Sequence, residues 1–319
     1  MVPVGVALIG AGRWGLTVAS ALSKLENVDL RWICELEGER LARAAALYPR
    51  AAMTDRVAEA LADAGVAAAF VAVDSARHHA VGIRVLESDR HLLVEKPMAL
   101  STADAAELRA TADARQRVLT VGHLLLHHPA VRRARQLVVE GALGDVLCVE
   151  SARLAPGPPR APGSAWWSLA PHDVSLALHL LGAVPVAVSA TGGAYAEAGH
   201  DGVAFATLHF EGGRVAHIHV GRFAAEKTRR SVVSGTRRAL VFDEVARHGC
   251  LTLHEPGRPP EEVRTDAVDP LLAQCAHFLS CVRRSDASGG NAAHALAVVR
   301  VLEAGARSMR ARGTPVELA

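Results

Sequence analysis

Short apolar runs alternate with amphipathic segments over the first 122 residues. The apolar runs predict buried strands over residues 4–9, 28–34, 66–73, 91–94 and 118–122. Helical spacing between them predicts helices over residues 16–25, 40–47, 56–63, 79–86 and 102–113. Fully apolar strands that alternate with helices are typical of a parallel sheet covered on both faces. The pattern therefore predicts an α/β domain, a doubly wound Rossmann sheet, over residues 1–122.

The pattern changes to a period of two in the second half of the chain. After a predicted helix over residues 171–181, apolar and polar positions alternate in segments 184–192, 203–210, 214–222, 229–234 and 239–242. Such alternation indicates antiparallel strands with one covered face. Closing helices over 270–284 and 292–311 complete an α+β domain with a largely antiparallel open sheet over residues 123–319. These helices are candidates to pack back on the first domain. The Pro/Gly-rich stretch 155–163 predicts an exposed loop.

Composition narrows the class of protein. The 319 residues include 35 Lys and Arg against 33 Asp and Glu, and the basic residues are dispersed, so no nucleic-acid partner is indicated. No apolar run approaches the roughly 18 residues that span a bilayer, so we expect no membrane partner. The five cysteines are widely spaced, which is typical of reduced thiols and predicts no metal site. Without a signal-peptide pattern, we expect a cytoplasmic location.

The first predicted strand ends in a glycine turn, GAGRWG, that leads into a helix. Gly10 permits the tight turn, Gly12 allows close approach of a pyrophosphate, and Gly15 allows the helix to pack on the strand. The start of the helix offers free N–H groups and the positive end of its dipole to phosphates. This context predicts a dinucleotide site that also includes Arg13 and Trp14.

The second predicted strand ends at Glu35, twenty residues after Gly15. A dinucleotide fold places there the acid that accepts hydrogen bonds from the adenosine ribose. A carboxylate repels a 2′-phosphate, so NAD(H) is preferred. Arg40 follows closely enough to reach such a phosphate, and NADP(H) is therefore not excluded. The alternative is that Glu35 is a solvated acid at a strand end.

The triplet Glu95-Lys96-Pro97 follows the apolar run 91–94. Desolvation at the end of a buried strand disfavours an ammonium ion, so Lys96 is a candidate proton donor and acceptor. The alternative is that its side chain extends to solvent.

These motifs and several others resemble the glucose-fructose oxidoreductase, inositol dehydrogenase and MocA-type oxidoreductase family. The further matching stretches are the loop ending in His78, then 121–123, 128–130, 141–146 and the helix at 172–173. The resemblance extends from residue 4 to residue 318. It implies an NAD(P)-dependent oxidoreductase with an N-terminal Rossmann domain. It also implies an open C-terminal sheet that often serves oligomerisation, so we expect a homo-oligomer, a dimer or a tetramer.

The resemblance also implies roles for residues of the first domain. Lys96 is expected to face the nicotinamide and the substrate hydroxyl as acid/base. The residues expected along the cofactor are Val73, Asp74, His78 and Glu95. His123 stands where family members contact substrate.

A second catalytic element is implied on the helix near residue 172. Inositol dehydrogenase-like members carry His-Glu-Ile-Asp followed four residues later by His. Here His172 and His179 match the two histidines, but Ser175 replaces the aspartate. Serine neither ionises nor holds an imidazole by charge, so His172 becomes the expected partner of Lys96.

The stretch 165–173 is more similar to members that act on nucleotide-linked amino or keto sugars. Trp166 or Trp167 is a candidate to stack on a sugar or base, and the alternative is that both fill a domain interface. Arg153 and Arg160 are candidates to hold a diphosphate, or they are solvated loop residues. The predicted substrate residues are His123, Arg153, Trp167 and Asp173.

These observations together predict an enzyme, an NAD(H)-dependent dehydrogenase or ketoreductase. Hydride would pass between nicotinamide and a ring secondary alcohol or ketone of a small-molecule sugar or cyclitol. A nucleotide-linked sugar, or an amino or keto sugar, is favoured. Three alternatives stay open: glycoside cleavage by transient oxidation with bound NAD, a catalytically silent nucleotide-sensing regulator, and an imine or dihydrodiol reductase.

Overall fold

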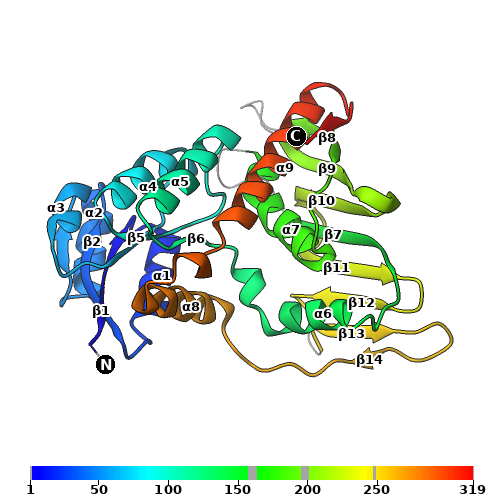
Figure 1. Ribbon diagram of the computed structural model, residues 1–319, viewed down its shortest axis with the longest axis horizontal. Coiled ribbons are helices and arrows are strands. Elements are labelled where there is room, and N and C mark those ends of the chain that lie inside the picture. The colour runs from blue at the N-terminus through cyan, green and yellow to red at the C-terminus, as the bar shows by residue number, and fades with distance from the viewer. Residues whose placement is uncertain (1, 157–163, 195–200, 247–248, 319) are drawn as a thin grey trace. The chain divides into compact units, whose positions relative to one another are not determined.

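The computed structural model describes residues 2–156, 164–194, 201–246 and 249–318 (Figure 1). The chain folds into two compact units. The first contains Met1–Leu124 and Asp269–Leu296, and the second contains Leu125–Val268 and Ala297–Ala319. Among the helices in the described ranges, none is both long enough and apolar enough to cross a membrane.

The first unit is built on a six-stranded parallel sheet with the order β3-β2-β1-β4-β5-β6. Its strands are β1 (Val4–Ile9), β2 (Val28–Cys34), β3 (Ala52–Thr54), β4 (Ala68–Val71), β5 (His91–Val94) and β6 (Leu119–Val121). Its helices are α1 (Arg13–Leu22), α2 (Gly38–Leu47), α3 (Val57–Ala62), α4 (His78–Glu87), α5 (Thr102–Ala114) and α8 (Pro270–Arg284). The strand order reverses beside β1, so the sheet is doubly wound and the predicted fold class is confirmed.

Helices cover both faces of this sheet (Figure 1). Helices α1 and α8 pack against each other on one face, and α4 and α5 pack together on the other. On the first face Phe70 of β4 meets Phe278 of α8 edge-to-face, with ring centroids 5.2 Å apart. Every residue of β1, β4, β5 and β6 is buried. Strands buried on both faces need apolar residues throughout, which explains the continuous apolar runs.

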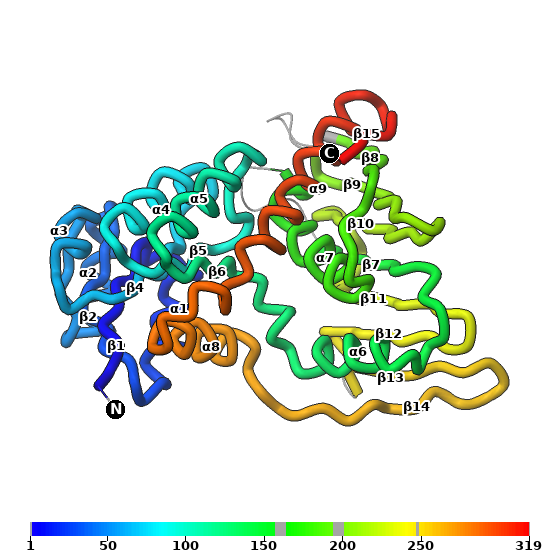
Figure 2. Tube along the Cα trace, in the orientation of Figure 1, coloured from blue at the N-terminus to red at the C-terminus, as the bar shows by residue number. Residues whose placement is uncertain are grey.

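The second unit is built on a nine-stranded sheet with the order β14-β13-β12-β11-β7-β10-β9-β8-β15. Its strands are β7 (Val146–Pro156), β8 (Ala187–Ala194), β9 (Asp201–His209), β10 (Val215–Ala224), β11 (Thr228–Gly235), β12 (Ala239–Asp243), β13 (Leu251–His254), β14 (Glu261–Glu262) and β15 (Val316–Glu317). All neighbours are antiparallel except β7 and β10, which are parallel. Figure 2 shows β15, near the end of the chain, alongside β8.

Helices of the second unit cover one face of the sheet. They are α6 (Pro129–Val139), α7 (Ala165–Leu181) and the later part of α9 (Ala292–Arg310), whose first residues belong to the first unit. Helix α7 lies on β7, β9 and β10. The strand positions that face away from it stay partly exposed, and the Phe205 side chain is 41% exposed. One covered and one open face confirm the reading of the period-two segments.

Strands β3, β13, β14 and β15 and helix α6 were not predicted from the sequence, and two further differences concern the region around α7. Strand β7 was not predicted, although it pairs with both β10 and β11. Helix α7 begins at Ala165, six residues before the predicted start, and the Ser164 hydroxyl accepts a hydrogen bond from the Trp167 N–H at 3.1 Å. Pro171 lies inside the helix. Proline usually interrupts a helix because it lacks an N–H, so Pro171 looked like a helix start.

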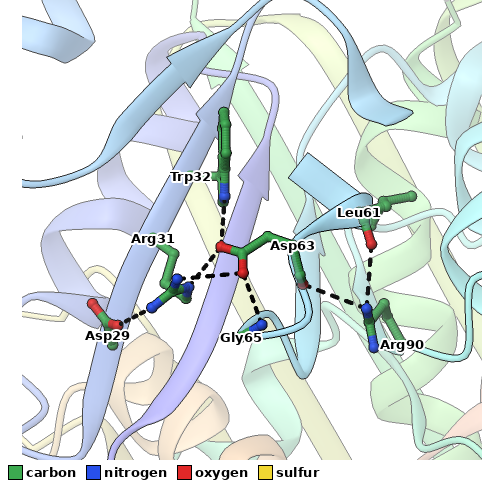
Figure 3. Close-up of polar contacts among 7 residues, drawn as sticks. All are labelled: Asp29, Arg31, Trp32, Leu61, Asp63, Gly65 and Arg90. Carbon is green, nitrogen blue, oxygen red and sulfur yellow. Dashed lines mark hydrogen bonds and ion pairs between the residues drawn. The ribbon is translucent and has the colours of Figure 1, made fainter. Parts of the chain in front are cut away.

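Asp63 closes the turn between α3 and β4 (Figure 3). Its carboxylate accepts hydrogen bonds from Arg31 Nε at 2.8 Å, Trp32 Nε1 at 2.9 Å and the Gly65 N–H at 2.8 Å. Arg90 donates to two backbone carbonyl oxygens at the end of α3. The side-chain bonds from Arg31 and Trp32, with the Gly65 N–H, lower the pKa of Asp63 from 3.8 to about 2.

We expect the stability of the protein to fall as pH falls from 3.8 toward about 2, in part because Asp63 takes up a proton. The folded pKa lies below the unfolded value, so the stabilising effect of the carboxylate is complete above 3.8 and is lost as pH falls through the folded pKa. Asp63→Asn should flatten this part of the profile in urea unfolding followed by tryptophan fluorescence. Asp113→Asn, on the exposed Arg109 pair, should leave it unchanged. An unaltered profile in Asp63→Asn would contradict the assignment.

Candidate functional site

The three glycines of the turn between β1 and α1 differ in how much space surrounds them. Gly10 has a φ of +95°, and a Cβ there would lie 2.5 Å from the Ala72 carbonyl oxygen. A Cβ on Gly15 would overlap the Gly10 carbonyl oxygen. At Gly12 the nearest heavy atom to an added Cβ is Arg40 Nη1, at 3.9 Å. The fold requires glycine at positions 10 and 15, whereas Gly12 leaves room above the backbone for a bound group.

Glu35 lies buried at the end of β2, beside the glycine turn. Its Oε2 accepts a hydrogen bond from the Ala11 N–H at 2.7 Å, and its Oε1 accepts from the Leu36 and Glu37 N–H groups at 2.8 and 3.1 Å. Carboxylate oxygens accept more than one bond each, so a ribose hydroxyl can still donate to this group. Arg40 pairs with Glu37 at 2.9 Å.

The start of α1 is suited to an anion. Gly12 is its N-cap and supplies no side-chain hydrogen bond, and the first turn contains no acidic residue. The first N–H groups of the helix are thus available to a phosphate. Arg13 and Trp14 lie exposed in this first turn. A side-chain hydrogen bond from Trp14 also reaches Glu95 and lowers the pKa of that carboxyl, against a larger raising effect of burial.

His78 connects the loops that follow β4 and β5. It is 1% exposed, with Nδ1 2.7 Å from the Pro97 carbonyl oxygen and Nε2 3.2 Å from that of Val73. Burial lowers the pKa of His78, although both carbonyl contacts oppose this. Asp74, in the same loop, accepts a hydrogen bond from the Ala76 N–H at 3.0 Å. Two of the residues expected along the cofactor, Asp74 and His78, therefore also stabilise the conformation of the loop.

Glu95 and Lys96 follow β5 at the carboxyl edge of the sheet. Glu95 is buried, its Oε2 accepts the Lys96 N–H at 3.3 Å, and a Cβ on Gly122 would lie 2.7 Å from that oxygen. Burial raises the pKa of Glu95. After burial, the charge on Lys96 contributes to lowering the pKa of both His78 and His123. The glycine turn, Glu35 and Lys96 all follow parallel strands at the same edge, where such sheets bind ligands.

The second unit carries the predicted histidines on α7. His172 and His179 are both partly buried and are separated by seven residues, about 10 Å along a helix. Burial, together with the charge of Arg135 on α6, lowers the pKa of His179. Arg135 donates a hydrogen bond to the Leu180 carbonyl oxygen at 2.9 Å. Ser175, which lies between the two histidines in the sequence, is buried.

Arg153 lies on strand β7, so the alternative of a solvated loop residue is wrong. Its side chain is 7% exposed, with Nε 2.8 Å from Asp173 Oδ2 and Nη2 2.6 Å from Glu244 Oε1. Burial lowers the pKa of Arg153, but the two carboxylates outweigh this and raise it above the ordinary value. The Ser151 hydroxyl donates to Asp173 Oδ1 at 2.6 Å. Arg153 and Asp173 thus satisfy each other. Arg160 lies outside the described residues.

The two tryptophans of α7 have different surroundings. Trp166 is fully buried in the core of the second unit, and its Nε1 donates to the Leu302 carbonyl oxygen at 2.8 Å. Gly305 approaches its ring so closely that a Cβ there would lie 2.5 Å from it. Trp167 is half-buried and packs against the edge of the same core. Trp166 is therefore a packing residue.

Residues 4–123 match the model of an oxidoreductase family with an NAD-binding Rossmann fold, and residues 131–241 match the GFO/IDH/MocA C-terminal domain. UDP-N-acetylglucosamine 3-dehydrogenase from Acidithiobacillus ferrooxidans is 30% identical over 294 residues, which cover 88% of this chain and 90% of that protein. This chain belongs to the GFO/IDH/MocA oxidoreductase family. The family resemblance read from the motifs is thereby confirmed.

Solved structures of other proteins share the fold. GenD2 from gentamicin A biosynthesis, in complex with NAD, has a TM-score of 0.88 and 27% identity, covering 100% of this chain and 97% of that one. An inositol dehydrogenase homologue from Azotobacter vinelandii, complexed with NADH and myo-inositol, has a TM-score of 0.86 and 17% identity, covering 99% and 98%. The prediction that this chain is an NAD-binding oxidoreductase is thereby confirmed.

In this GFO/IDH/MocA member, the start of α9 contributes residues that no sequence motif revealed. Asn291 Oδ1 accepts a hydrogen bond from the Val121 N–H at 2.7 Å, and Asn291 Nδ2 donates to the Val121 carbonyl oxygen at 3.0 Å. The amide thus pairs with edge strand β6 as a neighbouring strand would. One turn later, His294 lies edge-to-face against buried His123, with ring centroids 5.7 Å apart.

Proposed function

We propose that this chain is an NAD(H)-dependent dehydrogenase or ketoreductase acting on a ring secondary alcohol or ketone of a nucleotide-linked sugar. The observation that carries the proposal is the position of Lys96, which follows β5 at the sheet edge that also carries the glycine turn and Glu35. The similarity to UDP-N-acetylglucosamine 3-dehydrogenase supports the substrate class.

Lys96 is the proposed acid/base. When bound, NAD(H) supplies the hydride acceptor or donor. In the oxidation Lys96 takes the hydroxyl proton of the substrate, and in the reduction it returns a proton to the carbonyl oxygen. His172 is the proposed second residue at the hydroxyl, because Ser175 has no charge with which to orient an imidazole. His179, the other histidine that matches the family pattern, lies about two turns further along α7 and is the third proposed catalytic residue.

Cofactor and substrate contacts follow from the same proposal. Glu35, held by three backbone N–H groups, favours a free 2′-hydroxyl and hence NAD(H) over NADP(H). We assign substrate contact to His123 and Trp167. Arg153 of β7 and Asp173 of α7 form an ion pair that connects the helix to the sheet. We assign them the role of positioning residues for the neighbouring His172.

A spectrophotometric panel tests the proposal. Nucleotide-linked sugars, free sugars, cyclitols and imines are each mixed with the protein and NAD or NADH, and absorbance is followed at about 340 nm. We expect turnover with nucleotide-linked sugars. Product without net change in NADH would favour glycoside cleavage by transient oxidation, and NADH binding without turnover on any compound would favour a regulator.

Replacing Gly12 by valine should weaken NADH binding at least about tenfold without lowering the melting temperature, because the protein leaves that space open. Fluorescence titration with NADH and thermal melting measure the two effects. Gly15→Ala is the control. Its Cβ would overlap a backbone carbonyl oxygen, so it should lower the melting temperature instead. Unchanged NADH affinity in Gly12→Val would contradict the placement of the pyrophosphate.

We also propose that the protein is a cytoplasmic homo-oligomer. The open face of the nine-stranded sheet supports assembly, since Phe205 is exposed there and stacks on His219 at a centroid distance of 4.2 Å. All five cysteines are free thiols, which suits a reducing compartment. Sedimentation velocity measures the subunit number, and a monomer at all concentrations would contradict the assembly.

A further inference from the structure

A histidine pair lies in the first unit, where His123 and Lys96 each stand two residues beyond a paired strand position, Val121 of β6 and Val94 of β5. His123 is 2% exposed, His294 is half-buried, and their ring centroids are 5.7 Å apart with planes at 83°. Neither ring nitrogen of His123 has a hydrogen-bond partner among the described residues. Most buried polar atoms in folded proteins are hydrogen-bonded. Two unsatisfied nitrogens on one buried ring therefore indicate a role other than packing.

The fold holds these two rings at a defined separation. Asn291 pairs with both backbone groups of Val121, and a Cβ on Gly290 would overlap a carbonyl oxygen of β6. The start of α9 is thereby fixed to the edge of the sheet. His294 follows one turn into α9 and His123 stands two residues beyond Val121, so the same contact sets both positions.

The charged neighbours of His123 are Lys96 and His294. Burial, then the charges of His294 and Lys96, lower the pKa of His123 well below its ordinary value of 6.5. His123 is therefore a neutral imidazole near neutral pH, with one nitrogen that accepts a proton and one that donates. A neutral imidazole beside an ammonium group is suited to receive its proton.

We propose that His123 and His294 form a relay that carries protons between Lys96 and solvent. The relay rests on the proposed function of Lys96. In the oxidation, the substrate O–H bond breaks and its proton joins the Lys96 amine; bound nicotinamide would accept the hydride from the C–H bond. The Lys96 ammonium then gives a proton to the accepting nitrogen of His123, and the other nitrogen releases its proton to His294 and on to solvent. One proton leaves for each NADH formed, and the reduction runs in reverse.

The ring separation suits such a relay. An N–H···N hydrogen bond of about 2.9 Å sets imidazole centres about 5 Å apart. The observed 5.7 Å is close to that separation. A filled site excludes water from the lysine, so the proton needs a route through the protein. The half-buried His294 is the end of this route nearer to solvent.

His294→Phe and His123→Phe test the relay in the full chain. Each keeps a ring but removes the nitrogens. We expect kcat to fall at least about tenfold with NADH affinity within about twofold of wild type. Added imidazole should restore part of the rate of His294→Ala, which leaves room for it. The control is His79→Gln, on a histidine paired with Glu107 at 2.9 Å, which should retain full activity. Unchanged turnover, or a loss that imidazole does not restore, would overturn the relay.

A spectroscopic measurement keeps the relay testable without a substrate. In ¹⁵N-histidine spectra of the wild type, His123 should stay neutral from about pH 6 to 8. Its nitrogen shifts should change in Lys96→Met and in His294→Phe but not in His79→Gln. If no compound in the panel turns over, the proposed function fails and this measurement decides alone. If the ¹⁵N shifts of His123 are the same in the wild type, Lys96→Met and His294→Phe, the relay is overturned.

Discussion

Lys96→Met should lower kcat by about 10²- to 10⁴-fold, the usual contribution of general acid–base catalysis, while NADH affinity stays within about twofold of wild type. The reason is that methionine keeps the length and apolar stem of lysine but cannot exchange a proton. Initial rates with the nucleotide-linked sugar and fluorescence titration with NADH measure the two quantities separately. Full turnover with intact NADH binding would show that Lys96 is not the acid/base.

The chain offers a matched control and a test of the partner. Lys24 is an exposed lysine just after α1, so Lys24→Met should leave both quantities unchanged. His172→Asn tests the second proposed residue. Residues that act in one step give losses that are far from additive, so Lys96→Met combined with His172→Asn should lose little more than Lys96→Met alone. Independent, additive losses would place His172 outside the proton-transfer step.

Arg153→Met should lower the free energy of unfolding by about 3–5 kcal/mol, because it leaves two carboxylates, those of Asp173 and Glu244, without their buried partner. Urea unfolding at neutral pH measures the loss. Arg229 supplies the control: it lies 3.5 Å from the same Glu244 but is 43% exposed, so Arg229→Met should cost less than about 1 kcal/mol.

The same variant separates two roles for Arg153. A positioning residue beneath α7 affects stability first, whereas a diphosphate clamp would affect the KM for a nucleotide-linked sugar without affecting unfolding. We expect the first result because both partners of Arg153 are carboxylates, of which Asp173 is buried and Glu244 is only 14% exposed. Unchanged stability with a raised KM for the nucleotide-linked sugar would instead support the diphosphate clamp and contradict the positioning role.

The nucleotide-binding half of this protein is largely visible in its sequence. The glycine turn, Glu35 and the apolar strands depend on spacing over at most about two dozen residues. In the structure the glycine turn follows β1 and Glu35 follows β2, as predicted. Local spacing suffices because a tight turn, a helix start and a strand buried on both faces each impose their own residue pattern. The period-two segments likewise predicted the one-sided sheet of the second unit.

Only the tertiary structure decided which charged and polar side chains pair. Arg153 finds its partners 20 and 91 residues away, and Asn291 pairs with Val121 across 170 residues. An arginine near a proline-rich stretch has the same local pattern whether it lies in a solvated loop or on a buried strand. Burial is what separates the two cases, since a desolvated charge must be paired. That requirement comes from the packing of distant segments, which local spacing does not encode.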